Sequence, residues 1–234
     1  MDLKGKNILV TGGSSGLGKA TAKLMIEKGA NVAITGRDKT HLEKTAIEIG
    51  AFPICADVSK LEDVERTYRE FLGKFSKLDA LINNAGLGRG WDTVTDLKLE
   101  DFEYVYRINV FGAAMMGKEA AKLMVEQNHG AIINVGSTAA MKGFERGSVY
   151  ASSKFALRGM TQCWQAELRK HNIRVILVNP SYVPTAFGSE DKTQKPEEDN
   201  KLTSFEIAHS IVSALEMDDR GFIPEFAVWA TNPF

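Results

Sequence analysis

The chain has 234 residues, of which 44% are hydrophobic, and its formal net charge at pH 7 is -1. A chain of this length buries roughly 70–75% of its unfolded surface in one core, so we expect a single domain spanning residues 1–234. Charges of both signs are interspersed, which argues against a nucleic-acid partner or a polybasic membrane surface. No stretch approaches the ~18 apolar residues of a membrane span, and no long apolar signal segment follows Met1, so a cytoplasmic protein is expected.

The cysteines and histidines do not indicate a metal. Cys55 and Cys163 lie far apart in the sequence, and the four histidines form no cluster with ligand spacing. We interpret both cysteines as core thiols and expect no metal site.

The chain opens with a strand and a glycine-rich turn. Asn7–Val10 is a short apolar run, typical of a strand buried on both faces of a parallel sheet. Residues 11–18 (TGGSSGLG) allow a tight turn and a close approach of backbone to a phosphate, at which the next helix aims its free amides. An ordinary turn is the alternative, because one glycine motif is weak evidence. The cofactor-binding candidates here are Gly12, Ser14, Ser15, Gly16, Leu17 and Gly18.

The end of the second strand, Asn31–Thr35, indicates which nicotinamide cofactor is bound. NAD sites place an acidic residue there to bind the ribose 2′-hydroxyl, whereas NADP sites need a cation for the 2′-phosphate. Here Gly36 and Arg37 follow the strand, and a guanidinium suits a phosphate. We therefore expect NADP(H), with NAD(H) less favoured; a plain surface arginine is the alternative.

Two further strands end in residues that suit a ligand crevice. Phe52–Ala56 is followed by Asp57 and Val58, and Leu78–Asn83 by residues 84–86 (NAG), with a helix from about Leu61 to Phe75 between them. Helix capping and turn chemistry explain these residues nearly as well. The cofactor-binding candidates are Asp57, Val58, Asn83, Ala85 and Gly86.

The catalytic candidates lie between residues 109 and 154. A long helix from about Leu99 to Gln127 carries Asn109 between apolar neighbours, so Asn109 is expected to face inward. A fifth strand, Gly130–Gly136, delivers Ser137, the candidate hydrogen-bond partner of a tyrosine; a simple turn serine is the alternative.

Tyr150 and Lys154 lie four residues apart in a predicted helix, about Ser148 to Lys170, and so share one face. The ammonium is expected to lower the pKa of the phenol from its usual value near ~10. Such spacing also arises by chance, and the pair becomes a site only if the rest of the chain builds one around it.

The C-terminal third completes the pattern. A sixth strand, Ile173–Val178, leads into residues 179–185 (NPSYVPT), with Pro180, Val183 and Thr185 as cofactor-binding candidates. Residues 186–201 are polar and are predicted to be a mobile substrate loop, with a solvated connection as the alternative. A helix at about 204–217 and a strand near 225–229 finish the chain. The alternation predicts an α/β fold, a doubly wound parallel sheet of about seven strands flanked by helices, with ligands at the carboxyl ends.

Both long helices carry apolar residues over more than one stripe. Examples are Phe111 and Met115 on the first, and Phe155 and Trp164 on the second. Such a helix usually has a second buried surface, so a subunit interface is expected. Packing between layers of one subunit is the alternative.

Taken together and in this order, these motifs resemble the classical short-chain dehydrogenase/reductase family. The resemblance rests on TGxxxGxG at 11–18, Asp57, NNAG at 83–86, Asn109, Ser137, YxxxK at 150–154 and the segment 180–185. It implies a Rossmann-type, NADP(H)-dependent oxidoreductase in which Tyr150 donates a proton to a carbonyl and Ser137 polarises the substrate oxygen. It also implies that Lys154 lowers the tyrosine pKa and holds the nicotinamide ribose, and that Asn109 anchors a water-linked proton relay.

The resemblance extends to substrate and assembly. It implies a homotetramer or homodimer and reduction of a 3-oxoacyl thioester, as in 3-oxoacyl-acyl-carrier-protein reductases. A sepiapterin-type or other small carbonyl reductase is the alternative, and a non-catalytic NADPH sensor is the alternative from another class. Two departures stand out: Ser181 replaces the family's usual glycine, and Ser14-Ser15 stand where many NADP-binding members carry a basic residue.

Overall fold

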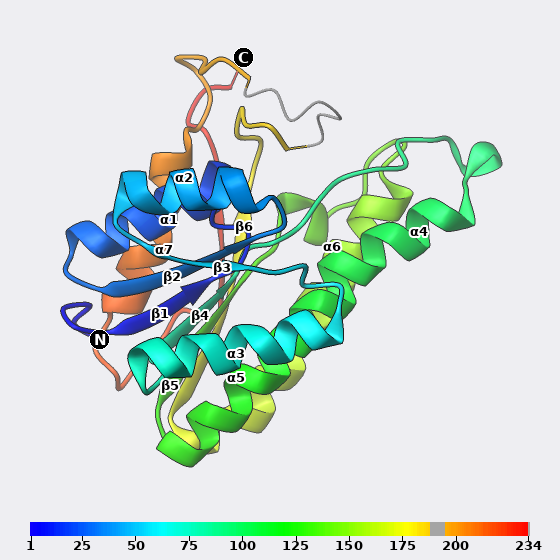
Figure 1. The fold of residues 1–234 in the computed structure, drawn as a ribbon. Coiled ribbons are helices and arrows are strands. Elements are labelled where there is room, and N and C mark those ends of the chain that lie inside the picture. Colours follow the sequence, from blue (N-terminus) through cyan, green and yellow to red (C-terminus); the bar gives the residue numbers. More distant parts are fainter. Residues whose placement is uncertain (188–194, 234) are drawn as a thin grey trace.

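Seven apolar segments of the chain form one parallel sheet in the computed structural model, which describes residues 1–187 and 195–233 (Figure 1). The strand order is β3-β2-β1-β4-β5-β6-β7. The strands are β1 (Asn7–Val10), β2 (Asn31–Gly36), β3 (Phe52–Cys55), β4 (Ala80–Asn83), β5 (Gly130–Val135), β6 (Ile173–Pro180) and β7 (Glu225–Val228). The predicted doubly wound α/β sheet of about seven strands is confirmed.

The strand order reverses between β1 and β4. Leu9 of β1 pairs with Ala33 of β2 on one side and with Leu81 of β4 on the other, so β1 is central. Successive connections leave β1 in opposite directions, which opens a crevice at the carboxyl ends of β1 and β4. In open parallel sheets, this reversal is where ligands bind.

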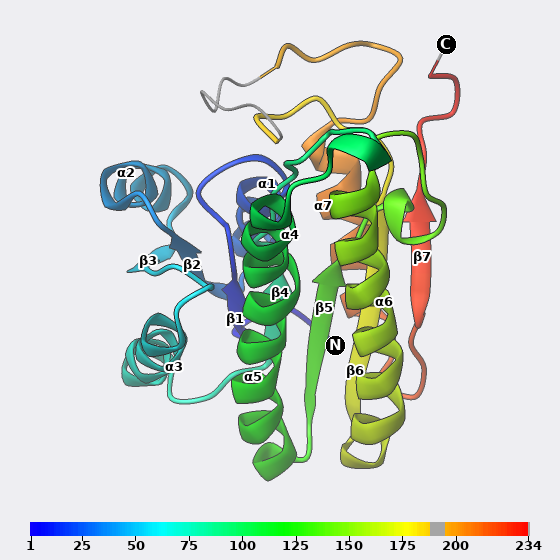
Figure 2. The ribbon, with the colours of Figure 1, turned by 90° about the vertical axis from the view of Figure 1, so that its right-hand side faces the viewer.

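Helices cover both faces of the sheet (Figure 2). Because side chains alternate along a strand, Ile8 and Val10 pack into one core cluster while Leu9 packs into the other. The first face is covered by α1 (Gly16–Glu27), α2 (Lys39–Ile49) and α7 (Ser204–Glu216). The second is covered by α3 (Leu61–Phe75), α5 (Ala113–Gln127) and α6 (Ser148–Leu168), and α4 (Leu99–Tyr106) leads into α5.

Two helical segments differ from the sequence expectation. The predicted helix at 99–127 contains a π-helical turn, η2 (Arg107–Gly112), which joins α4 to α5 and carries Asn109. The helix α2 was not expected. Its first turn is capped by Asp38, whose carboxylate accepts a hydrogen bond from the His41 amide, and it ends at Gly50, whose φ is +77°.

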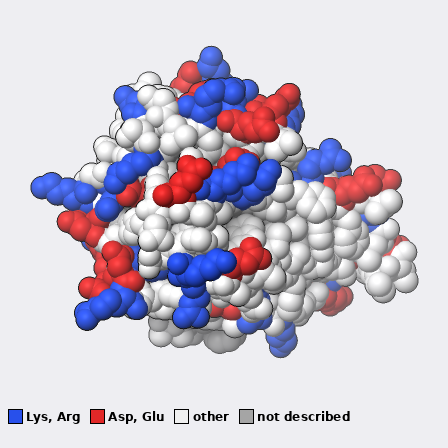
Figure 3. Space-filling view, turned by 90° about the horizontal axis from the view of Figure 1, so that it is seen from below, with Lys and Arg blue, Asp and Glu red and all other residues white. Residues whose placement is uncertain are grey.

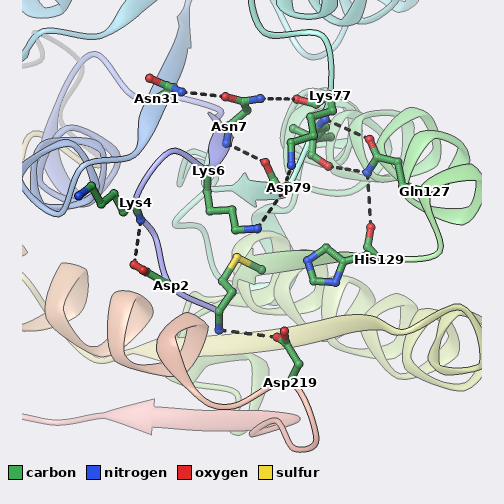
Figure 4. Close-up of polar contacts among 12 residues, drawn as sticks. Asp2, Lys4, Lys6, Asn7, Asn31, Lys77, Asp79, Gln127, His129 and Asp219 are labelled. Atoms are coloured by element: carbon green, nitrogen blue, oxygen red, sulfur yellow. Dashed lines mark hydrogen bonds and ion pairs between the residues drawn. The ribbon is translucent and has the colours of Figure 1, made fainter.

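A buried carboxylate joins the amino ends of the strands (Figure 4). Asp79, which is 2% exposed, accepts a hydrogen bond from the Asn7 amide at 2.9 Å and pairs with Lys6 at 3.4 Å and Lys77 at 3.2 Å. The Asn7 side chain accepts a further bond from Asn31 at the start of β2. This end of the sheet is closed by internal contacts, in contrast to the carboxyl end.

The surface carries charges of both signs, interspersed on the face that Figure 3 shows. Among residues 1–187 and 195–233, no helix is long and apolar enough to cross a membrane. Within the same residues, no group of three or more His, Cys, Asp or Glu side chains is placed to hold a metal ion. Cys163 is exposed on α6 and Cys55 is half-buried, so the core-thiol interpretation is wrong for Cys163.

Candidate active site

The glycine-rich turn between β1 and α1 packs tightly against the end of β4. A Cβ atom at Gly18 would lie 2.4 Å from the Gly12 carbonyl oxygen and 2.5 Å from the Asn84 side-chain amide. At Gly12, whose φ is +64°, it would lie 3.0 Å from the Ala85 Cα. Any side chain at these two glycines would therefore displace backbone. The turn presents bare backbone beside the amino end of α1, an arrangement that suits a phosphate group.

Other candidates of this turn lie around it. Ser15 is exposed and precedes α1 without capping it through its side chain, and Ser14 is half-buried. Gly16, with a φ of +50°, faces Thr185, and Leu17 packs against the core. The turn and the segment after β6 are thus brought together at the same end of the sheet.

Thr11 and Asn84 tie β1 to β4 where the strand order reverses. The Thr11 hydroxyl oxygen accepts hydrogen bonds from the amides of Asn84 and Ala85, both at 3.0 Å. The Asn84 side-chain amide donates to the carbonyl oxygens of Thr11 at 2.9 Å and Gly12 at 3.1 Å. These bonds fix the floor of the crevice and place Ala85 beside the glycine turn.

Asn109 is 1% exposed and all its side-chain polar atoms are bonded. Its Oδ1 accepts from the Leu87 amide at 2.9 Å, and its Nδ2 donates to the Leu87 carbonyl at 2.9 Å and to Ser153 Oγ at 3.1 Å. A Cβ atom at Gly86 would lie 3.2 Å from Asn109 Oδ1 and 3.5 Å from Lys154 Nζ. The predicted inward orientation is therefore confirmed, and Asn109 lies near Lys154.

Tyr150 and Lys154 lie one turn apart on α6, above Ser137 at the end of β5. The Ser137 side chain acts on the Tyr150 hydroxyl and lowers its pKa, and Ser137 Oγ accepts a hydrogen bond from the Ala139 amide at 3.1 Å. Lys154 Nζ lies 5.8 Å from the centroid of the Tyr150 ring and donates to the Val135 carbonyl at 3.0 Å. Asn179 accepts a bond from the Ser137 amide at 3.2 Å, which holds the serine in place. Three polar side chains from two elements therefore converge at one point.

Burial moves the pKa values of this pair in opposite directions. Desolvation raises the pKa of Tyr150 to about 12, and the Ser137 hydrogen bond opposes that rise only in part. Desolvation also lowers the pKa of Lys154 to about 8. The predicted lowering of the phenol pKa by Lys154 is therefore wrong for this structure: burial raises the pKa of Tyr150, and the effect that opposes it comes from Ser137.

Arg37 lies at the mouth of the crevice. Its side chain is exposed, and Nη1 donates to the Tyr104 hydroxyl on α4 at 3.4 Å. Gly36 lets the end of β2 pack closely against the glycine turn, since a Cβ atom there would lie 3.1 Å from Ser14 Oγ. The guanidinium thus stands between the end of β2 and α4 with no carboxylate at the end of the strand.

Asp57 and Asn83 have structural contacts. Asp57 Oδ1 accepts hydrogen bonds from the amide and hydroxyl of Ser59, which is a turn before α3 and not a helix cap, since the N-cap of α3 is Lys60. Asn83 is 4% exposed, and its side-chain amide donates to the Ala113 carbonyl at 3.0 Å and to Asn134 Oδ1 at 3.1 Å. The Asn83 side chain points into the core beneath α5, so only its backbone is left for the crevice.

The remaining predicted cofactor-binding residues lie at the ends of β3 and β6. Val58 is buried, Pro180 ends β6, Val183 packs half-buried against the core and Thr185 is 7% exposed. The predicted substrate loop at 186–201 lies partly outside the described residues, since its central part is 188–194, and its mobility stays a prediction.

Sequence reasoning missed an aromatic wall at this site. Trp91, Phe144 and Phe187 come from three loops, and their rings gather around Tyr150. A signal was present: each is a large aromatic residue in a loop, and all three lie close to a glycine, either Gly88 or Gly147. Spacing alone could not show that these loops meet.

The parallel sheet and the arrangement of Ser137, Tyr150 and Lys154 at its carboxyl edge agree with the comparison to known families. A family model described as short chain dehydrogenase matches residues 6–196, and the chain belongs to that family. It is therefore an oxidoreductase of the short-chain dehydrogenase type.

Three relatives show how the match extends over the chain. The NADP-dependent 3-hydroxy acid dehydrogenase of Schizosaccharomyces pombe is 34% identical over 245 residues, covering 98% of this chain and 94% of that protein. The structure of the alcohol dehydrogenase of the archaeon Thermococcus sibiricus, complexed with 5-hydroxy-NADP, is 28% identical with a TM-score of 0.89 and 97% coverage of both chains. The structure of the 3-ketoacyl-(acyl-carrier-protein) reductase of Brucella melitensis, complexed with NADH, is 28% identical with a TM-score of 0.89; it covers 99% of this chain and 100% of that chain.

Proposed function

We propose that this protein is an NADP(H)-dependent reductase that converts a ketone to a secondary alcohol. The observation that carries the proposal is the placement of Ser137 beside the Tyr150 hydroxyl, one helical turn from Lys154 and at the same edge of the sheet as the glycine turn. Burial raises the pKa of the Tyr150 phenol to about 12, so the hydroxyl holds a proton at neutral pH that it can donate.

Each side chain has a distinct part in the reaction. When bound, a reduced nicotinamide would supply the hydride that the carbonyl carbon needs. Ser137 donates a hydrogen bond to the substrate oxygen, and Tyr150 transfers its hydroxyl proton to the same oxygen. The Lys154 ammonium stabilises the phenolate that remains, because an opposite charge favours the ionised form. Asn109, bonded to Leu87, keeps the β4 loop beside Lys154.

The residues present fit a dinucleotide phosphate. A side chain at Gly12 or Gly18 would collide with the turn itself or with the residues after β4, so the glycines keep this turn tight and its backbone bare. Arg37 supplies the cation that a 2′-phosphate needs. NADP(H) is therefore favoured, in agreement with the NADP named for the S. pombe and T. sibiricus relatives, and NAD(H) is the less favoured cofactor, although NADH is named for the Brucella structure. The proposed cofactor contacts are Gly12, Ser14, Ser15, Gly16, Leu17, Gly18, Arg37, Asp57, Val58, the backbone of Asn83, Ala85, Gly86, Tyr150, Lys154, Pro180, Val183 and Thr185.

The substrate class we favour is a 3-oxoacyl thioester. It is supported by the Brucella relative, which is named as a 3-ketoacyl-(acyl-carrier-protein) reductase. The S. pombe relative is named for a 3-hydroxy acid, which shares the oxygen position of the corresponding product but carries a free carboxylate. Both substrates place the reacting carbon two bonds from a carboxyl-derived group.

The experiment is NADPH oxidation, with NADH alongside, against 3-oxoacyl thioesters, free 3-oxo acids, diketones and pterins. Wild type should turn over a 3-oxoacyl thioester, and Tyr150→Phe should lose about 10²–10⁴-fold in rate while still binding NADPH, because only the acidic hydroxyl is removed. Undiminished turnover by Tyr150→Phe, or tight NADPH binding by wild type with no turnover of any carbonyl, would rule the proposal out.

The cofactor assignment has its own control. Arg37→Ser should raise the KM for NADPH about 10-fold or more and leave the KM for NADH nearly unchanged, because only the 2′-phosphate distinguishes the two. Lys39→Ser removes an exposed cation two residues away, paired with Glu43 at 3.9 Å, and should change neither value. Equal effects of Arg37→Ser on both cofactors would contradict a phosphate role.

A further inference from the structure

Four aromatic rings form a cluster at the catalytic centre, which we call the aromatic cluster: Trp91, Phe144, Tyr150 and Phe187. The Trp91 ring centroid lies 5.6 Å from that of Tyr150 and 6.1 Å from that of Phe144, and the Phe187 centroid lies 5.5 Å from that of Tyr150. These are the separations of interacting aromatic pairs. The catalytic phenol is thus a member of the cluster.

Glycines create the space that the rings occupy. A Cβ atom at Gly88 would lie 2.6 Å from Trp91 Cζ2 and 3.1 Å from Phe187 Cε1, so Trp91 and Phe187 approach this loop only because residue 88 has no side chain. A Cβ atom at Gly147 would likewise lie 2.7 Å from Phe144 Cζ. Substitution at either glycine would move a ring of the cluster.

The cluster is buried at its base and open at its rim. Tyr150 is 9% exposed, whereas Trp91 is 40%, Phe187 is 42% and Phe144 is 51% exposed. Three large apolar rings are thus partly exposed to water around a catalytic hydroxyl, and the protein does not gain the free energy that their full burial would give. A substrate with a matching apolar group would recover that burial on binding.

The charged neighbours of Trp91 are already paired. Arg89 Nε lies 2.6 Å from Asp101 Oδ1, and Asp101 is 5% exposed. Asp92 Oδ2 lies 4.0 Å from Lys98 Nζ. The charge of Arg89 is therefore offset by the buried Asp101 carboxylate, which weakens its attraction for a substrate carboxylate. Recognition beside Trp91 therefore falls to apolar contact.

We propose that Trp91, Phe144 and Phe187 form a subsite for an aryl group, or one of similar apolar bulk, on the side of the ketone away from the thioester. The inference rests on the proposed ketone reduction and narrows its substrate class. The substrate carbonyl lies at Tyr150 while the aryl ring contacts Trp91, and a carboxylate in that position is disfavoured.

The turnover test uses three N-acetylcysteamine thioesters that share the ketone: 3-oxobutanoyl, 3-oxo-5-phenylpentanoyl and 3-oxohexanedioyl. Wild type should prefer the phenyl over the methyl compound by about 10-fold or more in kcat/KM and should use the carboxylate least. Trp91→Ala should bring the phenyl-to-methyl ratio of kcat/KM close to one. Trp229→Ala, which removes a 62% exposed tryptophan outside the cluster, should leave the ratio unchanged.

A binding measurement separates this inference from the proposed reaction. The protein has three tryptophans, so 19F NMR of 5-fluorotryptophan-labelled protein resolves few signals, and the Trp91 signal is the one lost in Trp91→Phe. The alcohol product of the phenyl compound should shift that signal saturably, and less so in Gly88→Ala. No shift, or a wild-type preference for the methyl or carboxylate thioester, would overturn the subsite. A saturable shift without any turnover would overturn the reaction and retain the subsite.

Discussion

Lys154 is a cation held in a site where burial opposes its charge. Its ammonium is 4% exposed and donates one hydrogen bond to the Val135 carbonyl. Its pKa falls from 10.5 to about 8, so at neutral pH the folded protein bears a desolvated charge that the unfolded chain keeps in water. A residue retained at such a cost is a functional-site candidate on physical grounds.

This cost predicts how stability depends on pH. Lys154→Met should raise the free energy of unfolding at pH 7 by about 1–3 kcal/mol, because it removes the buried charge. Between pH 8 and 10.5, lysine is neutral in the folded protein and charged in the unfolded chain, so wild type gains stability with rising pH and the difference narrows. Urea unfolding of wild type and Lys154→Met at pH 7 and pH 9.5 measures this difference in the free energy of unfolding.

The control is an exposed lysine, Lys142, on the loop before α6. Lys142→Met should change the free energy of unfolding by less than about 0.5 kcal/mol at either pH. A Lys154→Met difference that is the same at pH 7 and pH 9.5 would contradict the lowered pKa.

At the scale of elements, the π-helical turn between α4 and α5 anchors the loop that follows β4. An asparagine in the middle of a helix is unfavourable, and here its side chain instead satisfies the amide and carbonyl of Leu87 just after β4. The π-helical turn contains Asn109, and such turns frequently mark functional sites. The hydrogen bonds between Asn109 and Leu87 therefore link the π-helical turn to the loop beside Lys154.

Asn109→Ala should lower the free energy of unfolding by about 2–4 kcal/mol, because it leaves the Leu87 amide and carbonyl and Ser153 Oγ without this partner. Hydrogen exchange at the Leu87 amide should also accelerate. Ser153→Ala removes only one of these bonds and should cost about 1 kcal/mol with slow exchange at Leu87 retained. Equal exchange rates at Leu87 in wild type and Asn109→Ala would show that the bond does not hold the loop.

At the scale of the molecule, the two long helices account for their apolar excess in different ways. Trp164 packs inside the subunit: a Cβ atom at Gly117 would lie 2.6 Å from its ring, so α5 and α6 approach closely there. Phe111 and Phe155 are 58% and 43% exposed. The intramolecular alternative thus explains Trp164, and the expectation of a homodimer or homotetramer rests on the two phenylalanines.

We expect Phe111→Glu or Phe155→Glu to lower the native mass toward that of one 25.7 kDa chain in light scattering, because a charge would be buried at the interface between copies. Phe205→Glu, on α7 and 59% exposed, is the matched control and should leave the native mass unchanged. A single-chain mass for wild type would contradict the predicted assembly.

The sequence by itself determined the order of elements and the end of the sheet that carries the site. The strands are continuous apolar runs, and the α3 helix at Leu61–Phe75 has a strong local periodicity, so both follow from patterns a few residues long. The glycines, Ser137, Tyr150 and Lys154 could be placed together because the carboxyl ends of parallel strands meet at one edge.

Only the tertiary structure decided how those residues behave. The pKa of Tyr150 rises because its burial outweighs its neighbours, and burial depends on segments far apart in sequence. Asn83 turns into the core because α5 offers it a carbonyl, and Cys163 is exposed because its side of α6 faces solvent. The rings around Tyr150 meet only after three loops have folded. Contacts between residues so far apart in the sequence produce no periodic pattern of apolar residues, so the sequence alone does not predict them.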